Sequence, residues 1–309
     1  MDGAVRRTPI GDNGAMPNSR SSHFEIGLDL GATLVKAVTV RAGRPITPFE
    51  SYVCSARNHP SLETFLAAHP ARRIAATGGG APRLVESWNG RPSILFVDEF
   101  ASWGAGERVL LEGAGFTPSA PHLLVSLGTG TSFLSVAANG TVARVGGTAL
   151  GGGTIRGLGR LLAGESSHEA LVSLARAGDR KKVDLLVGDL YRPGEIALDP
   201  SLTASNFGKP GLSRDPRDLM NAAVGLLGEN VALMAGAMAR CLPRTKGGSR
   251  RPTVVYAGTT LRHHDILKEI LADVTALAGA EARFLPSGEF TGAIGALAGA
   301  RARAQEAAP

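Results

Sequence analysis

The chain has 309 residues, of which 43% are hydrophobic and 19% charged, an ordinary balance for a folded globular protein. This length exceeds the usual single hydrophobic core, so two domains or lobes are expected. The net charge of +6 comes from basic residues scattered along the chain, and aromatic residues make up only 5%. Because stacking platforms are scarce, this composition argues against nucleic-acid binding.

The cysteine content and the composition of the N-terminus indicate the compartment and the tail. The two cysteines, Cys54 and Cys241, have neither metal-ligand nor disulfide spacing, which favours a reducing cytoplasm. No uninterrupted apolar run reaches the ~18 residues that a membrane helix needs, so we expect no membrane association. Residues 1–22 are rich in Gly, Pro, Asn, Ser and Arg and are predicted to form a disordered tail.

The first patterned stretch, residues 24–40, alternates as a strand, breaks at residues 29–33 and resumes as a strand. With Gly31 and Thr33 in the turn, such a hairpin can present backbone amides to an anion. Asp29 beside a phosphate requires a cation, so it is a candidate ligand for Mg²⁺. Lys36 could neutralise phosphate charge. The alternative is an ordinary hairpin with an exposed aspartate.

An abrupt acidic pair, Asp98 and Glu99, follows the apolar run at 94–97 and precedes a helical pattern at 101–111. Either carboxylate would suit a general base that reaches a substrate hydroxyl. The alternative is an acid at a helix N-terminus, where it interacts favourably with the helix dipole. Upstream, a helix is predicted at 61–69, and a strand at 72–76 runs into the glycine-rich turn 77–80.

The most glycine-dense part of the chain lies between residues 122 and 153. A buried-strand pattern at 123–125 breaks into Gly-Thr-Gly-Thr-Ser at 128–132, and Asn139-Gly140 predicts a hairpin turn further on. Three glycines at 151–153 then lead into a predicted helix. Glycine lets the backbone approach a ligand closely, and the Thr and Ser hydroxyls can bond phosphate oxygens. A tight turn without a ligand is the alternative.

The rest of the chain is predicted to be mainly helical. Helices are expected at 166–176, 183–191, 218–240, 264–278 and from 288 onward, with a buried strand at 253–257 that ends in Gly258-Thr-Thr. The glycine spacing at 288, 292 and 295 indicates close helix packing. The basic loop 244–251 is predicted to be a solvated surface.

These strand-and-glycine turns near the start, middle and end resemble the arrangement in the actin, sugar-kinase and heat-shock ATPase superfamily. Within it, the chain resembles the type II pantothenate kinases, from about residue 24 to the end. The matching stretches run in the family's order: residues 27–36, 76–81, 98–101, 126–132, 144–154, 204–208 and 292–297. The stretch 144–154 is the most specific, and sugar kinases do not share it.

The resemblance implies an α/β fold of the two-lobed actin-like ATPase (ribonuclease H-like) kind with a central cleft. Residues 23–118 would form an N-terminal lobe with the first phosphate hairpin and the general base. Residues 119–309 would form a C-terminal lobe with the second hairpin, the adenosine cradle and dimer helices, the last helix being free to pack back on the first lobe. ATP and Mg²⁺ are the implied cofactors, pantothenate the substrate and a homodimer the assembly. Many members are inhibited by acyl-CoA.

The resemblance also assigns residues. Glu99 matches the general base, and Arg144 matches the arginine that holds the substrate and stabilises transferring charge. Thr129 and Ser132 match hydroxyls that line the pantothenate site. The implied nucleotide-binding residues are Asp29, which also holds the metal, Gly31, Thr33, Lys36, Gly128, Thr129, Gly130, Gly151, Gly152, Gly153 and Gly258. Two departures are Ala32, where relatives usually have glycine, and an idiosyncratic insert at 192–201.

The implied reaction is ATP-dependent phosphorylation of pantothenate to 4′-phosphopantothenate, the first step of coenzyme A biosynthesis. One alternative is a kinase of another small alcohol such as an amino sugar. Sugar sites tend to carry an Asp and Asn pair after a strand, and only Asp98-Glu99 occurs here. The other alternative is a non-catalytic nucleotide-binding regulator, against which the presence of both Glu99 and Arg144 argues.

Overall fold

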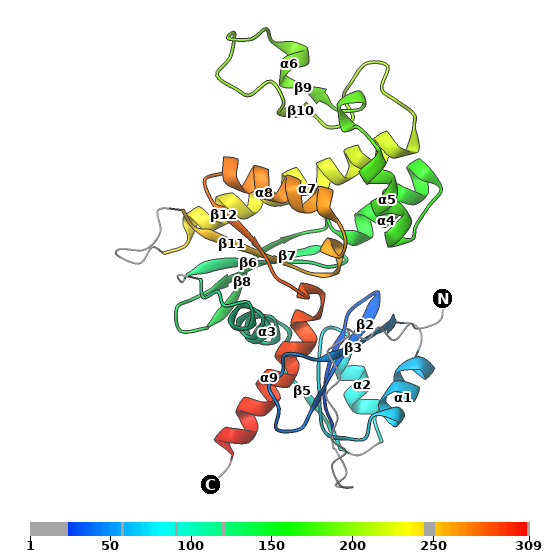
Figure 1. Ribbon diagram of the computed structural model, residues 1–309, viewed down its shortest axis with the longest axis vertical. Coiled ribbons are helices and arrows are strands. Elements are labelled where there is room, and N and C mark those ends of the chain that lie inside the picture. Colours follow the sequence, from blue (N-terminus) through cyan, green and yellow to red (C-terminus); the bar gives the residue numbers. More distant parts are fainter. Residues whose placement is uncertain (1–23, 57–58, 90–91, 119–120, 244–250, 308–309) are drawn as a thin grey trace, which may run out of the picture. The chain divides into compact units, whose positions relative to one another are not determined.

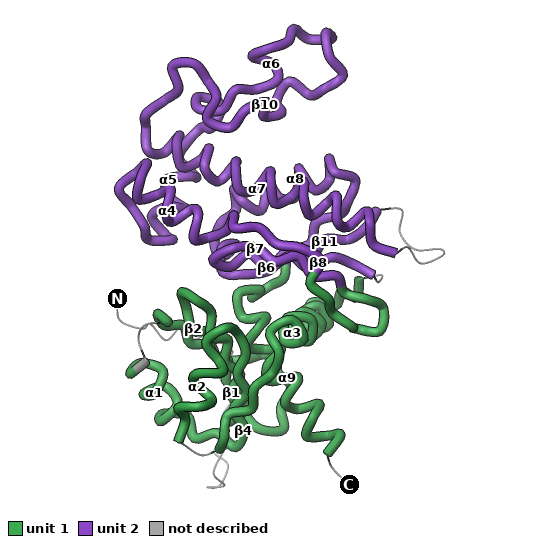
Figure 2. The backbone as a smooth tube through the Cα atoms, turned by 180° about the vertical axis from the view of Figure 1, so that it is seen from behind, with its two compact units in different colours: residues 1–120, 136–144, 285–309 green, residues 121–135, 145–284 purple. Residues whose placement is uncertain are grey.

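The computed structural model describes residues 24–56, 59–89, 92–118, 121–243 and 251–307. The predicted tail at 1–22 and most of the basic loop 244–251 lie outside these residues. The chain divides into two compact units, which are described one at a time. Unit 1 comprises residues 1–120, 136–144 and 285–309, and unit 2 comprises residues 121–135 and 145–284 (Figure 2). The lobe boundary predicted at residue 118 stays a prediction.

Unit 1 contains a five-stranded sheet in the order β3-β2-β1-β4-β5. The central strand β1 (Phe24–Leu30) pairs antiparallel with β2 (Leu34–Arg41) and parallel with β4 (Ala71–Thr77). The edge strands are β3 (Glu50–Ser55) and β5 (Ile94–Phe96). The predicted hairpin of residues 24–40 is therefore confirmed, and its first strand lies in the middle of the sheet.

Helices cover both faces of this sheet (Figure 1). On one side are α1 (His59–Ala68) and α2 (Ala81–Ser87); Leu62 and Leu66 of α1 share a buried cluster with Ile26 of β1. On the other side lies α9 (Thr291–Glu306), whose Ala296 is buried together with Ala75 of β4. A Cβ atom on Gly27 would lie 2.0 Å from the carbonyl oxygen of Ala293, so α9 and β1 are in backbone contact.

The helix α3 (Glu99–Gly113) packs equally closely against α9. A Cβ atom on Gly106 would lie 1.9 Å from the carbonyl oxygen of Thr291, and one on Gly295 would lie 1.6 Å from that of Ser102. Side chains cannot fit at either glycine, so the two helices meet backbone to backbone. The close helix packing predicted from the glycine spacing is confirmed.

Unit 2 is built around a second five-stranded sheet in the order β12-β11-β6-β7-β8. Its strands are β6 (His122–Leu127), β7 (Thr131–Val136), β8 (Val142–Thr148), β11 (Thr253–Ala257) and β12 (Glu281–Phe284). Residues 142–144 of β8 belong to unit 1. The two sheets share one topology. When the strands of each sheet are numbered in chain order and the second sheet is read from β8 to β12, both follow the order third, second, first, fourth, fifth. This repetition is the expected signature of a duplicated ribonuclease H-like fold.

The core of unit 2 lies between its sheet and its helices. The helices are α4 (Gly152–Ala163), α5 (His168–Ala177), α7 (Pro216–Cys241) and α8 (Asp265–Leu277). Figure 1 shows α7 and α8 running along one face of the sheet. By length and composition α7 could span a membrane, yet 61% of its most apolar stretch is buried inside the protein, where Val231 and Leu227 join the core.

A segment between α5 and α7 differs from the prediction. The helix predicted at 183–191 is replaced by a two-residue strand, β9 (Leu185–Leu186), and the single turn α6 (Val187–Leu190). The strand pairs with β10 (Thr203–Ser205) from the far end of the same loop. The buried carboxylate of Asp184 accepts a hydrogen bond from the amide of Phe207 at 2.9 Å. These contacts within the loop compete with helix formation, and the sequence pattern does not reveal them.

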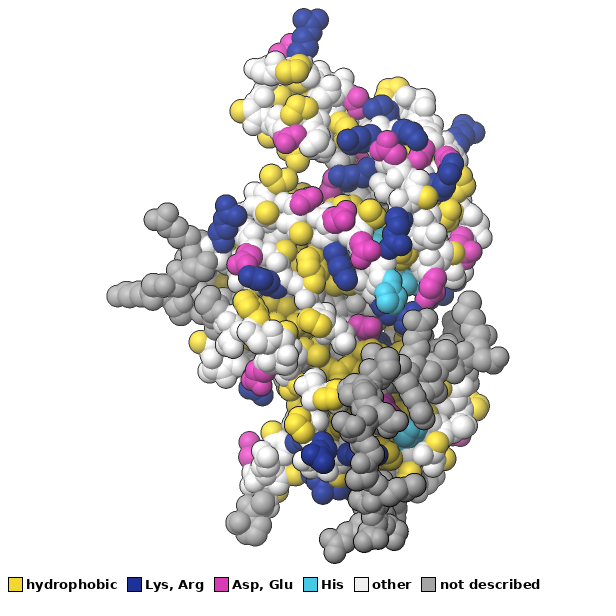
Figure 3. Space-filling model, in the orientation of Figure 1, with side chains coloured by type: hydrophobic (Ala, Val, Ile, Leu, Met, Phe, Trp, Pro, Cys, Tyr) yellow, Lys and Arg dark blue, Asp and Glu magenta, His cyan; other side chains and the backbone are white. Residues whose placement is uncertain are grey.

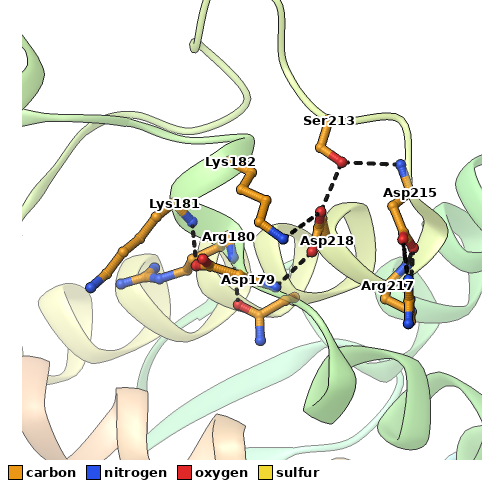
Figure 4. A network of polar contacts seen from close by, with 9 residues as sticks. Asp179, Arg180, Lys181, Lys182, Ser213, Asp215, Arg217 and Asp218 are labelled. Atoms are coloured by element: carbon orange, nitrogen blue, oxygen red, sulfur yellow. Dashed lines mark hydrogen bonds and ion pairs between the residues drawn. The ribbon is translucent and has the colours of Figure 1, made fainter.

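A polar network fastens this segment to the start of α7 (Figure 4). The carboxylate of Asp218 accepts hydrogen bonds from the amide of Asp179 and from the hydroxyl of Ser213, both at 2.8 Å. Lys182 lies 3.5 Å from the same carboxylate. One buried residue on α7 therefore binds both ends of the loop.

Charged residues on the surface of unit 2 are interspersed. On the face seen in Figure 3, lysine and arginine side chains alternate with acidic ones. Ion pairs in unit 2 include Arg176 with Asp265 at 2.9 Å and Arg262 with Glu169 at 2.7 Å.

Candidate active site

The first predicted site residues are brought together by the β1–β2 hairpin. Asp29 and Lys36 are register partners on neighbouring antiparallel strands. Directly paired positions project to the same face of a sheet, and Nζ of Lys36 lies 2.8 Å from Oδ2 of Asp29. Both residues are buried. The interpretation of an ordinary hairpin with an exposed aspartate is therefore wrong.

Two glycines from other elements complete the surroundings of Asp29. Gly78, in the turn after β4, has a φ of +88°, and a Cβ atom there would lie 2.9 Å from Oδ1 of Asp29. A Cβ atom on Gly292, in the first turn of α9, would lie 2.9 Å from Oδ2. Sequence reasoning assigned Gly78 to a turn and Gly292 to helix packing. It missed that both border the same carboxylate.

The acidic pair at the start of α3 separates into two roles. Asp98 is the N-cap, and its carboxylate accepts a hydrogen bond from the amide of Ala101 at 2.9 Å. Glu99 stands in the first turn and keeps contact with solvent. Partial desolvation, followed by the negative charges of Asp29 and Asp98, raises the pKa of Glu99 above its ordinary value, while Lys36 opposes the rise. Glu99 therefore lies within electrostatic reach of the Asp29–Lys36 pair.

The glycine-rich turn of unit 2 is built from two segments that lie against each other. The amides of Gly152 and Gly153, which open α4, donate to the carbonyls of Gly128 and Thr129 at 2.8 and 2.9 Å. A Cβ atom on Gly151 would lie 2.6 Å from Cα of Gly130. The three glycines thus allow the start of α4 to close directly behind the 128–130 turn.

Two threonine hydroxyls hold this turn in place. Thr131 donates to the carbonyl of Leu150 at 2.7 Å, and Thr260 donates to the carbonyl of Gly128 at 3.0 Å. Thr260 belongs to the short 3-10 helix η2 (Thr259–Leu261), which follows Gly258 with a φ of +118°. The turn at residues 258–260 is therefore hydrogen-bonded to the turn at residues 128–130. Sequence reasoning counted Thr131 among the hydroxyls that can bond phosphate and noted Thr260 only within the Gly258-Thr-Thr motif. It did not reveal that both hydroxyls hold this turn in place.

The remaining predicted residues occupy turns and strand surfaces. The amide of Gly31 donates to the carbonyl of Leu34 at 3.1 Å and closes the first hairpin, in which Ala32 is exposed and Thr33 half-buried. Arg144 is exposed on β8. In unit 2, Thr129 is exposed and Ser132 half-buried. The convergence of Glu99, Arg144, Thr129 and Ser132 on one substrate stays a prediction.

Asp29 is the candidate ligand for Mg²⁺ at this site. Among the described residues, no group of three or more His, Cys, Asp or Glu side chains could hold a metal ion. Mg²⁺ in kinase sites is usually bound by one or two carboxylates, substrate phosphates and several waters, so a protein cage is not required. A single buried carboxylate such as Asp29 fits that mode of binding.

Solved structures share this fold at low sequence identity. The activator of the 2-hydroxyisocaproyl-CoA dehydratase from Clostridium difficile, solved with bound ADPNP, superposes with a TM-score of 0.58 at 14% identity, covering 92% of this chain and 96% of that one. A ROK family protein from Streptococcus pneumoniae gives 0.52 at 12% identity, covering 92% and 99%. The chain therefore shares the α/β fold of these two structures, in agreement with the predicted actin-like ATPase fold.

Sequence comparison is more specific. The family model Fumble matches residues 52–299. The type II pantothenate kinase of Staphylococcus haemolyticus is 33% identical over 279 residues, which cover 89% of this chain and 99% of the relative. That of Oceanobacillus iheyensis is 32% identical over 275 residues, covering 88% and 98%. The chain belongs to the type II pantothenate kinase family.

Proposed function

We propose that this protein catalyses the ATP-dependent phosphorylation of pantothenate to 4′-phosphopantothenate, the first step of coenzyme A biosynthesis. The observation that carries the proposal is Glu99, a carboxylate with a raised pKa at the start of α3, within electrostatic reach of the buried Asp29–Lys36 pair. The family membership of the chain supplies the substrate.

In this reaction the primary hydroxyl oxygen of pantothenate forms a bond to the γ-phosphorus of ATP. The bond from that phosphorus to the β–γ bridging oxygen breaks, and ADP leaves. The hydroxyl proton passes to the carboxylate of Glu99. A raised pKa suits this role, because general bases work best when their pKa lies near the working pH.

The other residues would position the substrates and balance charge, which is most of what phosphoryl transfer requires. Arg144 would hold pantothenate and oppose charge on the transferring group, with Thr129 and Ser132 lining the substrate site. The first hairpin, through Gly31, Thr33 and Lys36, and the second, through residues 128–130 with 151–153 and Gly258 behind them, would hold the nucleotide. Mg²⁺ bound with ATP near Asp29 would neutralise phosphate charge.

The test is ADP release by the purified protein with ATP, Mg²⁺ and pantothenate. Glu99→Gln removes the proton acceptor with little change in shape and should lower kcat by about 10²- to 10⁴-fold. The matched control is Glu112→Gln, an exposed glutamate near the other end of α3, which should leave kcat unchanged. Near wild-type activity in Glu99→Gln would refute the general-base assignment.

A substrate panel separates the proposed reaction from the alternatives. Strong phosphorylation of N-acetylglucosamine without turnover of pantothenate would indicate a sugar kinase. ATP binding without turnover of any alcohol would indicate a regulator. Turnover of pantothenate with little or no turnover of the sugar is the expected result.

Assembly and feedback are proposed on family membership alone. We expect a homodimer, which light scattering on the purified protein would detect; a monomer at all concentrations would contradict it. We also expect acetyl-CoA to inhibit in competition with ATP. Unchanged initial rates at saturating acetyl-CoA and low ATP would rule this inhibition out.

A further inference from the structure

The carboxylate of Asp29 is enclosed by glycines on two sides. Gly78 faces Oδ1 and Gly292 faces Oδ2, each so closely that a Cβ atom would lie 2.9 Å from the oxygen. Oδ2 is also the oxygen that accepts the hydrogen bond from Lys36 at 2.8 Å. The carboxylate therefore has little room to turn while it remains paired with Lys36.

The helix that supplies Gly292 also contacts the helix that carries Glu99. One turn after Gly292, Gly295 lies against the carbonyl of Ser102, and Gly106 lies against the carbonyl of Thr291. Ser102 is one turn from the start of α3 at Glu99. A single rigid element thus touches Asp29 and, one helical turn further along, the helix that bears the general base.

The far end of α9 is also fastened to the strand that carries Asp29. Nε of Arg301 donates to Oε2 of Glu25 at 2.8 Å, and Glu25 is fully buried on β1. Nη1 of Arg73 on β4 donates to the other oxygen of Glu25 at 2.7 Å. These bonds fix α9 along β1, so that Gly292 cannot easily withdraw from Asp29.

We propose that α9 is a spacer that sets the position of the Asp29 carboxylate relative to Glu99, with Gly292 as its positioning residue. The inference rests on the proposed kinase function, in which Asp29 serves the nucleotide and its cation and Glu99 serves the alcohol. Gly292 acts by leaving a space that the Asp29 carboxylate occupies.

A methyl group at residue 292 gives the clearest test. In Gly292→Ala the new Cβ would lie 2.9 Å from Oδ2 of Asp29, closer than real Cβ atoms essentially ever come, and 3.0 Å from its Cγ. One of the two must shift, and because Glu25 fastens α9 along β1 we expect the carboxylate to move and its contact with Lys36 to lengthen. Because misplacing a reacting group by about 1 Å can cost 10²-fold in rate, we expect kcat to fall by about 10- to 10²-fold.

The effect should have a signature that a general loss of structure lacks. The Mg²⁺ concentration for half-maximal rate should rise by about 10-fold, a change that corresponds to about 1.4 kcal/mol. The KM for pantothenate should stay unchanged. The matched control is Gly157→Ala in α4, a helical glycine whose added methyl would meet nothing within 4 Å beyond its chain neighbours and its own helix backbone. This variant should retain the wild-type rate and Mg²⁺ dependence.

A thermal unfolding cycle tests the same contact without any activity measurement. Gly292→Ala alone should lower the melting temperature, since the methyl collides with Asp29. In an Asp29→Ala background the carboxylate is gone and only the Cβ of residue 29 stays close, at 3.3 Å, so the same substitution should lower the melting temperature much less.

The two proposals can fail independently. If the wild type does not phosphorylate pantothenate, the proposed function fails. The thermal unfolding cycle still shows whether residue 292 and the Asp29 carboxylate are in contact. If the wild type is active and Gly292→Ala keeps both its rate and its Mg²⁺ dependence, the spacer inference is overturned. An identical change in melting temperature in both backgrounds would overturn it as well.

Discussion

Nζ of Lys36 donates to Oδ2 of Asp29 across the first hairpin, and the pair is buried in unit 1. Removing one partner of a buried pair leaves an uncompensated charge, which usually costs more than the pair itself contributes. We expect Lys36→Met to lower the free energy of unfolding by about 3 kcal/mol, measured by urea denaturation. The exposed pair of Lys209 and Asp189, 2.9 Å apart, is the control, and Lys209→Met should change stability little. Equal losses in the two variants would contradict the prediction.

Asp98, the N-cap of α3, should contribute to stability through its capping hydrogen bond. Asp98→Ala removes the acceptor for the amide of Ala101 and should lower the free energy of unfolding by about 1 kcal/mol. Asp98→Asn keeps a capping oxygen and should stay close to the wild type in urea denaturation. Equal destabilisation by both substitutions would show that charge, and not capping, is what Asp98 contributes.

The acid limb of the pH–rate profile should report Glu99. Because desolvation and neighbouring negative charges raise the pKa of Glu99, its carboxylate is protonated, and inactive as a base, at a higher pH than an ordinary glutamate. We therefore expect kcat/KM to fall as the pH drops through a value above 4.5. Asp98→Asn removes one of the negative charges and should shift this limb to lower pH. A shift to higher pH, or none, would contradict the assigned cause.

The stability of unit 2 should depend on pH through His264. Desolvation, reinforced by the positive charge of His168, lowers the pKa of this buried imidazole to about 4. Between pH 6.5 and about 4 this histidine is protonated in the unfolded chain but neutral in the folded protein. The free energy of unfolding therefore falls as the pH drops from 6.5 toward 4. The full loss amounts to about 3 kcal/mol.

Urea denaturation at pH 7 and pH 5 would measure this dependence. His264→Phe removes the titrating group and should flatten the loss between the two pH values. His263→Asn changes the exposed neighbouring histidine and serves as the control, with the wild-type slope retained. The same slope in His264→Phe as in the wild type would show that other groups cause it.

The loop between α5 and α7 should loosen when its anchor on α7 is lost. Asp218→Ala removes the acceptor for the amide of Asp179 and the hydroxyl of Ser213, which lie at the two ends of the loop (Figure 4). We expect faster cleavage within residues 183–214 by a protease at low concentration. Asp215→Ala removes the N-cap of α7 and the ion pair with Arg217 but leaves both bonds to Asp218 in place, so it should alter cleavage less. Equal cleavage rates in the two variants would contradict the anchoring role.

Local patterns in the sequence were sufficient for much of the fold. The hairpin at 24–40 and the acidic junction at 98–99 were predicted because each depends on residues close in sequence. Alternation over β1 and β2 fixes their register, and a turn of three residues places Asp29 opposite Lys36. The resemblance to a known family then supplied roles that spacing alone left open.

What the sequence could not reveal depends on contacts between distant segments. Asp29 meets Gly78 and Gly292, the second of which is hundreds of residues away, and a glycine pattern does not say which backbone or side chain fills its empty space. The apolar run at 183–191 also misled. There, pairing of β9 with β10 and the buried Asp184 override helical periodicity.

The placement of α9 in unit 1 has a consequence for how the chain is made. During synthesis the strands of the first sheet leave the ribosome early, but Gly27, Ala75 and Gly106 need α9 against them, and α9 emerges only after all of unit 2. Domains generally fold as units when their residues are available. Unit 2 can therefore complete its core before α9 covers the first sheet. A released chain that is truncated after residue 284 should resist protease in unit 2 and be cleaved within residues 24–113.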